Sequence, residues 1–100
     1  MNKFCLDEGN IDFLKQAFNV LSEPNRIRII CMLGKSEEDL CVCEIVDDLG
    51  LKQNLVSHHL GVLKKINLVS SEKKGKYIYY SLNKEVYDKL KKIIGEVFNF

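Results

Sequence analysis

The segment from Asp39 to Leu63 constrains this chain more than any other part of its sequence. It holds two short helical patterns separated by Gly50, and helices so closely linked along the chain are expected to pack together. The first pattern opens with the thiol pair Cys41 and Cys43. The second carries the polar side chains Gln53, Asn54, Ser57, His58 and His59. The pattern therefore predicts a thiol pair beside a helix that can read nucleic-acid bases.

The length of the chain sets its domain organisation. It has 100 residues and contains no linker rich in Pro or Gly, no internal repeat and no low-complexity run. We therefore expect residues 1–100 to form a single domain, near the lower size limit at which one core is stable. No stretch approaches the roughly 18 apolar residues of a membrane span, and the N-terminus has no apolar signal region. We expect a cytoplasmic protein that makes no membrane contact.

Charge is distributed unevenly along the chain. Residues 1–50 carry five basic and ten acidic side chains, whereas residues 51–84 carry seven lysines and one glutamate. The net charge of +1 conceals this asymmetry. A segregated positive charge is typical of a surface that binds a polyanion, and the alternative is a basic surface that only improves solubility.

Four helical patterns occupy the first two thirds of the chain. The spacing of apolar residues predicts helices over about residues 11–21, 24–34, 42–49 and 53–66, with Asn10 as the first N-cap and Gly34 and Gly50 as stops. Residues 68–72 and 76–82 are instead rich in β-branched and aromatic side chains, with a lysine-rich turn at 73–75. These features predict a two-stranded hairpin, and hence a wing tipped with lysines.

A last helix is predicted over residues 84–98, and it has an apolar side. Val86, Leu90, Ile93, Ile94 and Val97 lie on that side. So small a domain leaves these residues little to cover, so we expect the first and last helices to form a twofold dimer interface. The alternative is that they close the core of the monomer.

The order helix, short turn, helix and hairpin is the winged helix-turn-helix layout. The sequence resembles the ArsR/SmtB family of metal-responsive transcriptional repressors over residues 11–98. The segments that carry the resemblance are Leu21–Ile29, Asp39–Ile45, Val56–Leu60 with Leu63, and Gly75–Tyr77 with Tyr80 and Leu82. The resemblance implies a mainly α winged helix-turn-helix homodimer with five helices and a two-stranded β-hairpin wing. It also implies a repressor that binds double-stranded operator DNA and leaves it when a metal or metalloid binds.

The fourth helix has the side chains that DNA reading requires. A helix fits the major groove, where amides such as Gln53 and Asn54 can pair with adenine. Ser57 and His58 fall near the same face, and at most one of His58 and His59 can face the groove squarely, because consecutive helical residues point about 100° apart. Leu55, Val56, Leu60 and Leu63 are expected to point toward the core. Phosphate contacts are expected from Lys64, Lys65, Lys73, Lys74 and Lys76.

The thiol pair has the chemistry of a soft-metal site. Thiolates favour zinc, cadmium, lead or trivalent arsenic over magnesium or calcium. Two helical residues two positions apart project about 200° from each other, so Cys41 and Cys43 can hold one ion only where the helix is irregular. Resemblance to cadmium and lead sensors implies that Cys5, on a flexible arm at residues 1–10, supplies a third sulfur from the other subunit. We expect arsenite, cadmium, lead or zinc as inducer, and no cofactor for DNA binding itself.

The remaining cysteine and the pairing of thiols lead to two further expectations. Cys31 lies in an apolar stripe, so we expect it in the core. A disulfide is disfavoured in a reducing cytosol, and the spacing of Cys41 and Cys43 is poor for bridging. The sequence also lacks catalytic spacings and phosphate-binding glycine loops, which argues against an enzyme.

Two other functions remain open from the sequence. One is a DNA-binding redox sensor in which Cys41 or Cys43 is oxidised, with Cys5 as a partner thiol, so that peroxide rather than metal releases DNA. The other is a winged helix that contacts proteins only. The lysines and the polar helix face argue against the second, whereas nucleic-acid binding with a flat salt dependence would support it.

Overall fold

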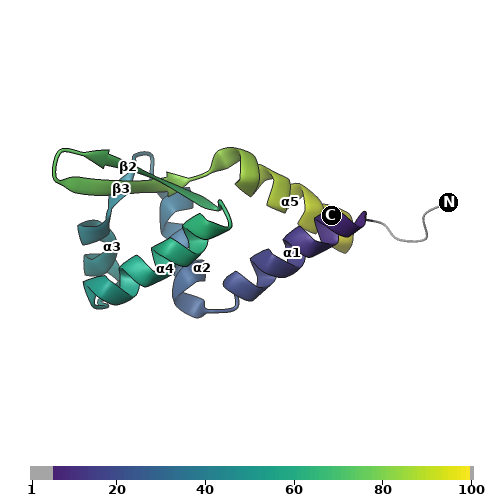
Figure 1. The fold of residues 1–100 in the computed structure, drawn as a ribbon, viewed down its shortest axis with the longest axis horizontal. Coiled ribbons are helices and arrows are strands. Elements are labelled where there is room, and N and C mark those ends of the chain that lie inside the picture. The colour runs from purple at the N-terminus through teal and green to yellow at the C-terminus, as the bar shows by residue number, and fades with distance from the viewer. Residues whose placement is uncertain (1–5, 100) are drawn as a thin grey trace.

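The computed structural model describes residues 6–99 and contains the expected helices and wing (Figure 1). Its elements are α1 (Glu8–Val20), α2 (Pro24–Lys35), β1 (Leu40–Cys41), α3 (Val42–Leu49), α4 (Gln53–Lys65), β2 (Val69–Lys74), β3 (Tyr77–Leu82) and α5 (Lys84–Phe98). The winged helix-turn-helix prediction, with five helices and a β-hairpin, is confirmed. Within residues 6–99, no helix is long and apolar enough to cross a membrane.

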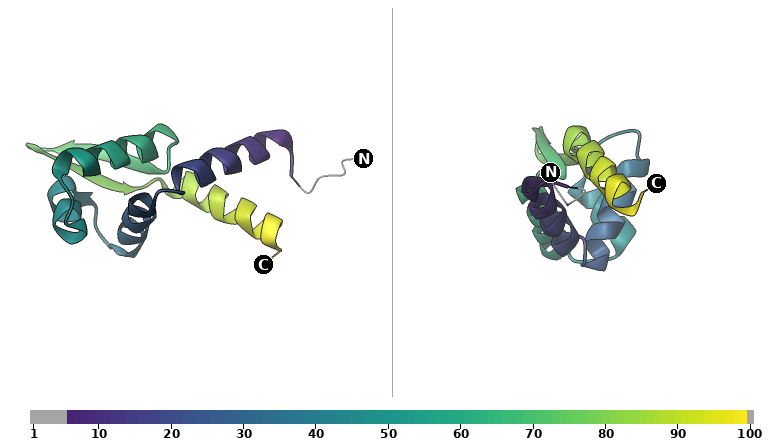
Figure 2. Two further views of the ribbon diagram at one scale, coloured as in Figure 1. Left: turned by 90° about the horizontal axis from the view of Figure 1, so that it is seen from below. Right: turned by 90° about the vertical axis from the view of Figure 1, so that its right-hand side faces the viewer.

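The molecule is elongated, with dimensions of 53 × 22 × 22 Å. At one end, α3, α4 and the hairpin lie together, and α2 packs against α4 behind them (Figure 1). At the other end, α1 and α5 project side by side away from the rest of the molecule (Figure 2). The fold therefore separates a compact end, with the candidate reading helix, from a pair of projecting helices.

The core of the compact end is built around α4. Val56, Leu60 and Leu63 recur at helical spacing along one side of α4, and each is fully buried. They pack with the fully buried Ile29 of α2 and Ile45 of α3. Burial of each such side chain contributes roughly 1.5–3 kcal/mol. This side of α4 is therefore fixed to the domain, and its opposite side is presented to solvent.

One leucine of α4 lies elsewhere than we predicted. Leu55 retains 40% of its surface exposed, so the expectation that it points to the core is wrong. Leu55 directly precedes the fully buried Val56. Consecutive residues of a helix point about 100° apart, so Leu55 falls outside the stripe of α4 that faces the core.

The first helix begins earlier than we predicted. The carboxylate of Asp7 accepts a hydrogen bond from the backbone N–H of Asn10 at 2.8 Å, so Asp7 and not Asn10 is the N-cap. Leu6 is buried in the core, which also ties down this end of the chain. Residues 6–10 therefore do not belong to the flexible arm predicted over residues 1–10, because Leu6 packs and α1 starts at Glu8. Residues 1–5, including Cys5, lie outside the described residues.

Several helix ends follow from single residues. Gly50 takes the left-handed conformation, with φ of 66°, and ends α3 as predicted, and Asn67 does the same after α4, with φ of 63°. Gly34 does not end α2, which continues to Lys35 and is closed by Ser36. The three residues from Gly50 to Lys52 then form the tight turn between α3 and α4.

The sheet has three strands in the order β1-β3-β2, one strand more than the sequence predicted. The hairpin of β2 and β3 turns at Gly75, where φ is 63°. The additional strand β1 pairs antiparallel with β3, with Leu40 opposite Tyr80 and Cys41 opposite Tyr79. The segment before α3 is therefore hydrogen-bonded to the wing.

Candidate nucleic-acid interface and thiol pair

The polar side of α4 is exposed as predicted. Gln53, Asn54, Ser57 and His58 all lie on the solvent side of the helix, because the buried stripe of Val56, Leu60 and Leu63 holds the other side. This arrangement leaves amide, hydroxyl and imidazole groups free to approach the edges of bases.

His59 does not share this exposed face. Only 5% of its surface is exposed, and its Nδ1 accepts a hydrogen bond from Nε of Arg26 at 3.1 Å. Its Nε2 lies 3.6 Å from a carboxylate oxygen of Glu23. Burial lowers the pKa of His59 and so favours the neutral ring, whereas the nearby Glu23 carboxylate has the opposite, smaller effect. The prediction that His59 contacts DNA is wrong, because its ring faces the start of α2.

Glu23 and Arg26 form a junction around His59 that the sequence analysis did not identify. The carboxylate of Glu23 caps α2, accepting from the backbone N–H of Asn25 at 2.8 Å and of Arg26 at 3.2 Å. Arg26 also donates through its guanidinium to the carbonyl of Val20 at 3.2 Å. An acidic residue directly before Pro24 at a helix start was the available signal. The junction sets the position of α4 relative to α1 and α2.

The predicted phosphate-binding lysines are all exposed, at the end of α4 and along the wing. Lys64 donates to the hydroxyl of Ser71 at 2.6 Å, which joins the end of α4 to β2. Lys74 lies 3.8 Å from a carboxylate oxygen of Asp39 and 5.4 Å from the ring centre of Tyr79. Exposed ion pairs of this kind contribute about 0–1 kcal/mol, so they leave such lysines available to phosphates.

Cys41 and Cys43 are joined by a disulfide, with their Cα atoms 5.3 Å apart. The expectation that their spacing is poor for bridging is therefore wrong. Cys41 is the last residue of β1 and the N-cap of α3, with φ of −78° and ψ of 159°, so it is extended and not helical. The irregular first turn that a shared ligand requires is thus present, and the two sulfurs converge. Glu44 supports this turn by accepting from the backbone N–H of Cys41 at 3.3 Å.

A cavity of about 390 Å³ places the sulfur pair next to the candidate reading groups. Its lining residues are Cys41, Val42, Cys43, Gln53, Ser57, Lys76, Tyr77, Ile78 and Tyr80. They come from the start of α3, from the exposed side of α4 and from the wing. A change at the sulfurs therefore occurs on the wall of a space that α4 and the wing also bound.

The thiol pair offers two candidate ligands for a metal ion, and the described residues bring no further ligand beside them. Among residues 6–99, no three His, Cys, Asp or Glu side chains gather as a metal site requires. The two sulfurs fit a soft ion once the disulfide is reduced, because they already converge. A third ligand would have to come from outside the described residues, where Cys5 lies, or from another chain.

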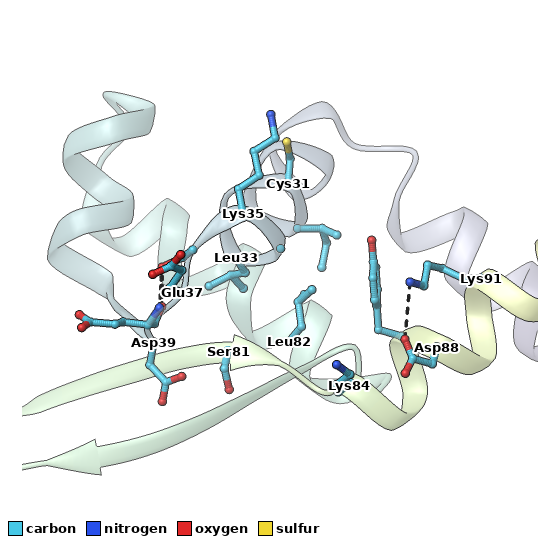
Figure 3. A pocket seen from close by; sticks show the side chains of 15 residues that line it. Cys31, Leu33, Lys35, Glu37, Asp39, Ser81, Leu82, Lys84, Asp88 and Lys91 are labelled. Atoms are coloured by element: carbon cyan, nitrogen blue, oxygen red, sulfur yellow. Dashed lines mark hydrogen bonds and ion pairs between the residues drawn. The ribbon is translucent and has the colours of Figure 1, made fainter.

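Cys31 is exposed on α2, so the expectation that it lies in the core is wrong. It stands beside Lys35 at the edge of a groove of about 740 Å³ between α2, the loop after it, β3 and α5 (Figure 3). Leu33 and Leu82 form apolar parts of the groove, and charged residues of both signs surround them. The helical period places Ile29 and Leu33 toward the core and turns Cys31 outward.

An apolar hollow of about 450 Å³ lies at the projecting end of the molecule. Ile11, Phe18 and Val97 line it while keeping 37%, 44% and 38% of their surfaces exposed. Leu6 and Leu14 form its buried part. These residues come from the N-terminal end of the chain, including α1, and from α5. Contiguous apolar surface on a small soluble domain is typical of an interaction site.

Comparison with known proteins assigns this architecture. The sequence profile described as "Bacterial regulatory protein, arsR family" matches residues 23–71. The arsenical resistance operon repressor of Bacillus subtilis is 34% identical over 86 residues, which cover 80% of this chain and 78% of that protein. The cadmium resistance regulatory protein CadC of Listeria innocua is 43% identical over 63 residues, covering 63% of this chain, and this match spans only 52% of CadC.

One solved structure shows the same fold in a homodimer. A homodimeric winged helix-turn-helix domain from Mycobacterium bovis, described as a possible ArsR-family regulator, superposes with a TM-score of 0.71 at 22% identity. The match covers 89% of this chain and 81% of that one. At this identity the likeness establishes the fold alone.

Proposed function

This chain belongs to the arsR family of bacterial regulatory proteins, and on that premise we propose that it is a homodimeric repressor released from operator DNA by a thiophilic ion. The observation that carries the proposal is the cavity shared by Cys41, Cys43, the exposed side of α4 and the wing. Operator DNA in bacteria is cytoplasmic, so we propose that the protein acts there. The family comprises transcription regulators and not enzymes.

We assign sequence reading to the exposed side of α4. Gln53 and Asn54 carry amides that can pair with adenine, and Ser57 and His58 can reach base edges or phosphates. The lysines of α4 and the wing would fix the register by contacting phosphates, without reading sequence. Each phosphate contact releases a bound cation from DNA, so affinity should fall steeply with salt. A flat salt dependence would instead favour the protein-binding function.

We assign dimerisation to α1 and α5. Their exposed apolar residues, Ile11, Phe18 and Val97, form one surface with the apolar hollow at the projecting end. A second copy presenting the same surface would bury it in a twofold interface. The M. bovis domain of the same fold is homodimeric, which agrees with association of two copies but does not identify the helices that mediate it. A dimer would carry two copies of α4, as two half-sites about one turn of DNA apart require.

The inducer site is proposed at Cys41 and Cys43 in their reduced form. Thiolates favour arsenite, cadmium, lead or zinc. The names of the B. subtilis and L. innocua relatives, which concern arsenical and cadmium resistance, support the first two. We propose Cys5 as a third ligand, reaching from the other subunit. Three sulfurs suit arsenite or lead, whereas tetrahedral zinc would need a fourth ligand.

The pairing of strands supplies a physical link from the sulfurs to the wing. Cys41 lies opposite Tyr79 in the β1–β3 ladder, and Cys43 lies in the first turn of α3, which packs on α4. Two sulfurs bound to one ion lie further apart than two bonded sulfurs, so ion binding would shift β1 against β3 or α3 against α4. We expect a coupling of about 1–3 kcal/mol between the ion and the DNA, enough to weaken operator binding by roughly 5- to 150-fold.

The proposal is tested by titrating the reduced protein with arsenite, cadmium, lead and zinc. Thiolate charge-transfer absorbance reports ion binding, and a fluorescently labelled operator reports release. Cys41→Ser and Cys43→Ser should abolish both signals, and Cys5→Ser should weaken them. Cys31→Ser is the matched control, because this exposed thiol lies outside the shared cavity. If Cys41→Ser and Cys43→Ser respond like the parent, the sensing site lies elsewhere. If Cys5→Ser matches the parent, Cys5 is not a ligand.

A further inference from the structure

The two sulfurs assigned to the inducer are bonded to each other in this structure. Sulfur in a disulfide is no longer a thiolate, and only the thiolate serves as a soft-metal ligand. We propose that the Cys41–Cys43 disulfide is a redox lock, which prevents the ion from binding while the DNA-reading surface stays assembled. This inference rests on the proposed function, because a lock on induction requires an inducer site at the same residues.

The reading surface is intact while the disulfide is present. Gln53 and Ser57 remain exposed on a regular α4, β1 keeps its pairing with β3, and α3 is helical from Val42 to Leu49. The hydrogen bond from Cys41 to Glu44 is also made. The arrangement proposed to bind DNA and the disulfide are therefore present together in this structure. This separates the lock from a redox sensor that leaves DNA on oxidation.

The surroundings of the two thiols suggest an order of reaction. Cys43 is exposed, whereas Cys41 has 5% of its surface exposed. A hydroperoxide can therefore reach the sulfur of Cys43 first, and Cys41 is placed to complete the bond. No third thiol is required, so Cys5 has no part in the closure.

The chemistry balances with a hydroperoxide as the oxidant. The thiolate of Cys43 attacks the outer peroxide oxygen, which breaks the O–O bond, releases an alcohol or water and leaves a sulfenic acid. The thiolate of Cys41 then attacks the sulfenic sulfur, forming the S–S bond and expelling hydroxide, which is protonated to water. Two electrons pass from the sulfurs to the peroxide, and the two thiol protons end in the products. A dithiol reductant reverses the state by thiol–disulfide exchange.

The full-length protein can be examined in both states with cadmium and arsenite as probes. One sample is treated with hydrogen peroxide and then with catalase, and the other is reduced and desalted. Peptide mass mapping locates the disulfide, thiolate absorbance follows ion binding, and a labelled operator follows DNA binding. In the reduced sample, the ion should weaken operator binding by about tenfold or more. In the oxidised sample, the absorbance band should be absent, and operator affinity should change less than about twofold on adding ion.

The comparison without ion distinguishes the lock from a redox sensor. Oxidised and reduced protein should bind the operator within about threefold of each other, and reduction of the oxidised sample should restore the ion response. Cys31→Ser should behave like the parent in every arm. Release of the operator by peroxide alone would overturn the lock, as would mapping of the disulfide to any other pair.

The failure of the lock and the failure of the proposed function give different results. If the reduced protein responds to the ion and the oxidised protein responds equally, the lock is wrong and the repressor function stands. If the reduced protein binds the operator but does not respond to cadmium or arsenite, the proposed release by a thiophilic ion is wrong. The redox lock is then wrong as well, because it acts on that release.

Discussion

The two ends of this molecule differ in how their apolar residues are arranged. At the compact end, Ile29, Ile45 and Leu60 are fully buried within one chain. At the projecting end, Phe18 and Val97 keep 44% and 38% of their surfaces exposed, beside an apolar hollow. The compact end thus closes its core within one chain, although Leu55 stays exposed outside it. The exposed apolar residues of α1 and α5 instead line one hollow, which we propose that a second copy covers.

The difference suggests that contacts within the chain stabilise the compact end, whereas association with a second copy adds to the stability of the projecting end. Contacts within the chain hold the compact end, and its buried residues belong to the same core cluster as Leu14 and Leu90 of the projecting helices. Stability at the projecting end should rise with concentration, because association of two copies buries the exposed surface. Perturbations placed at each end should therefore fail in different ways.

The largest expected effect is a loss of DNA affinity when a charge is placed on the projecting end. Phe18→Glu puts a carboxylate into the apolar surface of α1, and its burial in a dimer would be costly. The dimer should dissociate, and each monomer should then engage one half-site. Without the second contact, operator affinity should fall by about 100-fold or more. Analytical ultracentrifugation and operator titration measure the two effects.

Ile27→Glu is the matched control for that prediction. Ile27 is 52% exposed on α2, so it receives the same charge on a different surface. This variant should sediment as a dimer. A Phe18→Glu protein that also sediments as a dimer would show that α1 does not form the interface.

The second largest effect is a loss of stability when the core of the compact end is truncated. Leu60 is fully buried on α4, so Leu60→Ala leaves a cavity and should lower the free energy of unfolding by about 3 kcal/mol. Leu55→Ala on the same helix should cost less than about 0.5 kcal/mol, because Leu55 is 40% exposed. Denaturant unfolding at a fixed protein concentration compares them. Equal losses would mean that α4 packs by another face.

A third effect concerns pH at the junction of α2 and α4. Burial lowers the pKa of His59 below its usual value of 6.5. Both folded and unfolded chains hold a neutral ring above that pH, so His59 contributes no pH dependence there. As pH falls below 6.5, the unfolded chain takes up the proton first, and stability is lost until the folded pKa is passed. Melting temperatures measured across this range should show the decline.

His59→Asn tests the origin of this decline. The asparagine amide can offer an oxygen close to the position of Nδ1, so it can still accept from Arg26, but it does not titrate. The variant should lose this part of the pH dependence. His58→Asn, at the exposed neighbour, should keep it. An unchanged decline in His59→Asn would place the titrating group elsewhere.

The smallest expected effect is a gain in the free energy of unfolding from a better N-cap on α4. Lys52 is the N-cap of α4 and makes no side-chain hydrogen bond to the helix. Lys52→Ser would supply a hydroxyl acceptor and should raise stability by about 0.5–1 kcal/mol. The midpoint of denaturant unfolding is the measurement. A lower midpoint would show that the long side chain of Lys52 contributes packing that the serine lacks.

Local patterns predicted much of the fold. The bounds of α3 and α5 match the prediction, and the end of α4 lies within one residue of it, because Gly50 and Asn67 are short-range signals for a helix end. The exposed side of α4 followed from the spacing of Val56, Leu60 and Leu63. Each of these features depends on residues within a few positions of one another.

Features formed by distant residues were not predictable in the same way. A strand of two residues, Leu40 and Cys41, has no periodicity to detect, and it exists because β3 lies beside it. Local spacing places His59 among the DNA-binding residues, because it does not reveal that the ring is buried. That burial depends on Glu23 and Arg26, more than thirty residues earlier in the chain. The disulfide likewise required the extended Cys41 that β3 holds in place.

The sequence alone determined the helices, the wing, the amphipathic sides of α4 and α5 and the presence of two closely spaced thiols, because local spacing and turn chemistry specify these. The tertiary structure decided which histidine is buried, that Cys31 faces solvent and that the sulfurs converge beside Gln53 and Ser57. The physical reason is that burial and convergence depend on which distant segments meet, and a single linear pattern does not encode those contacts explicitly.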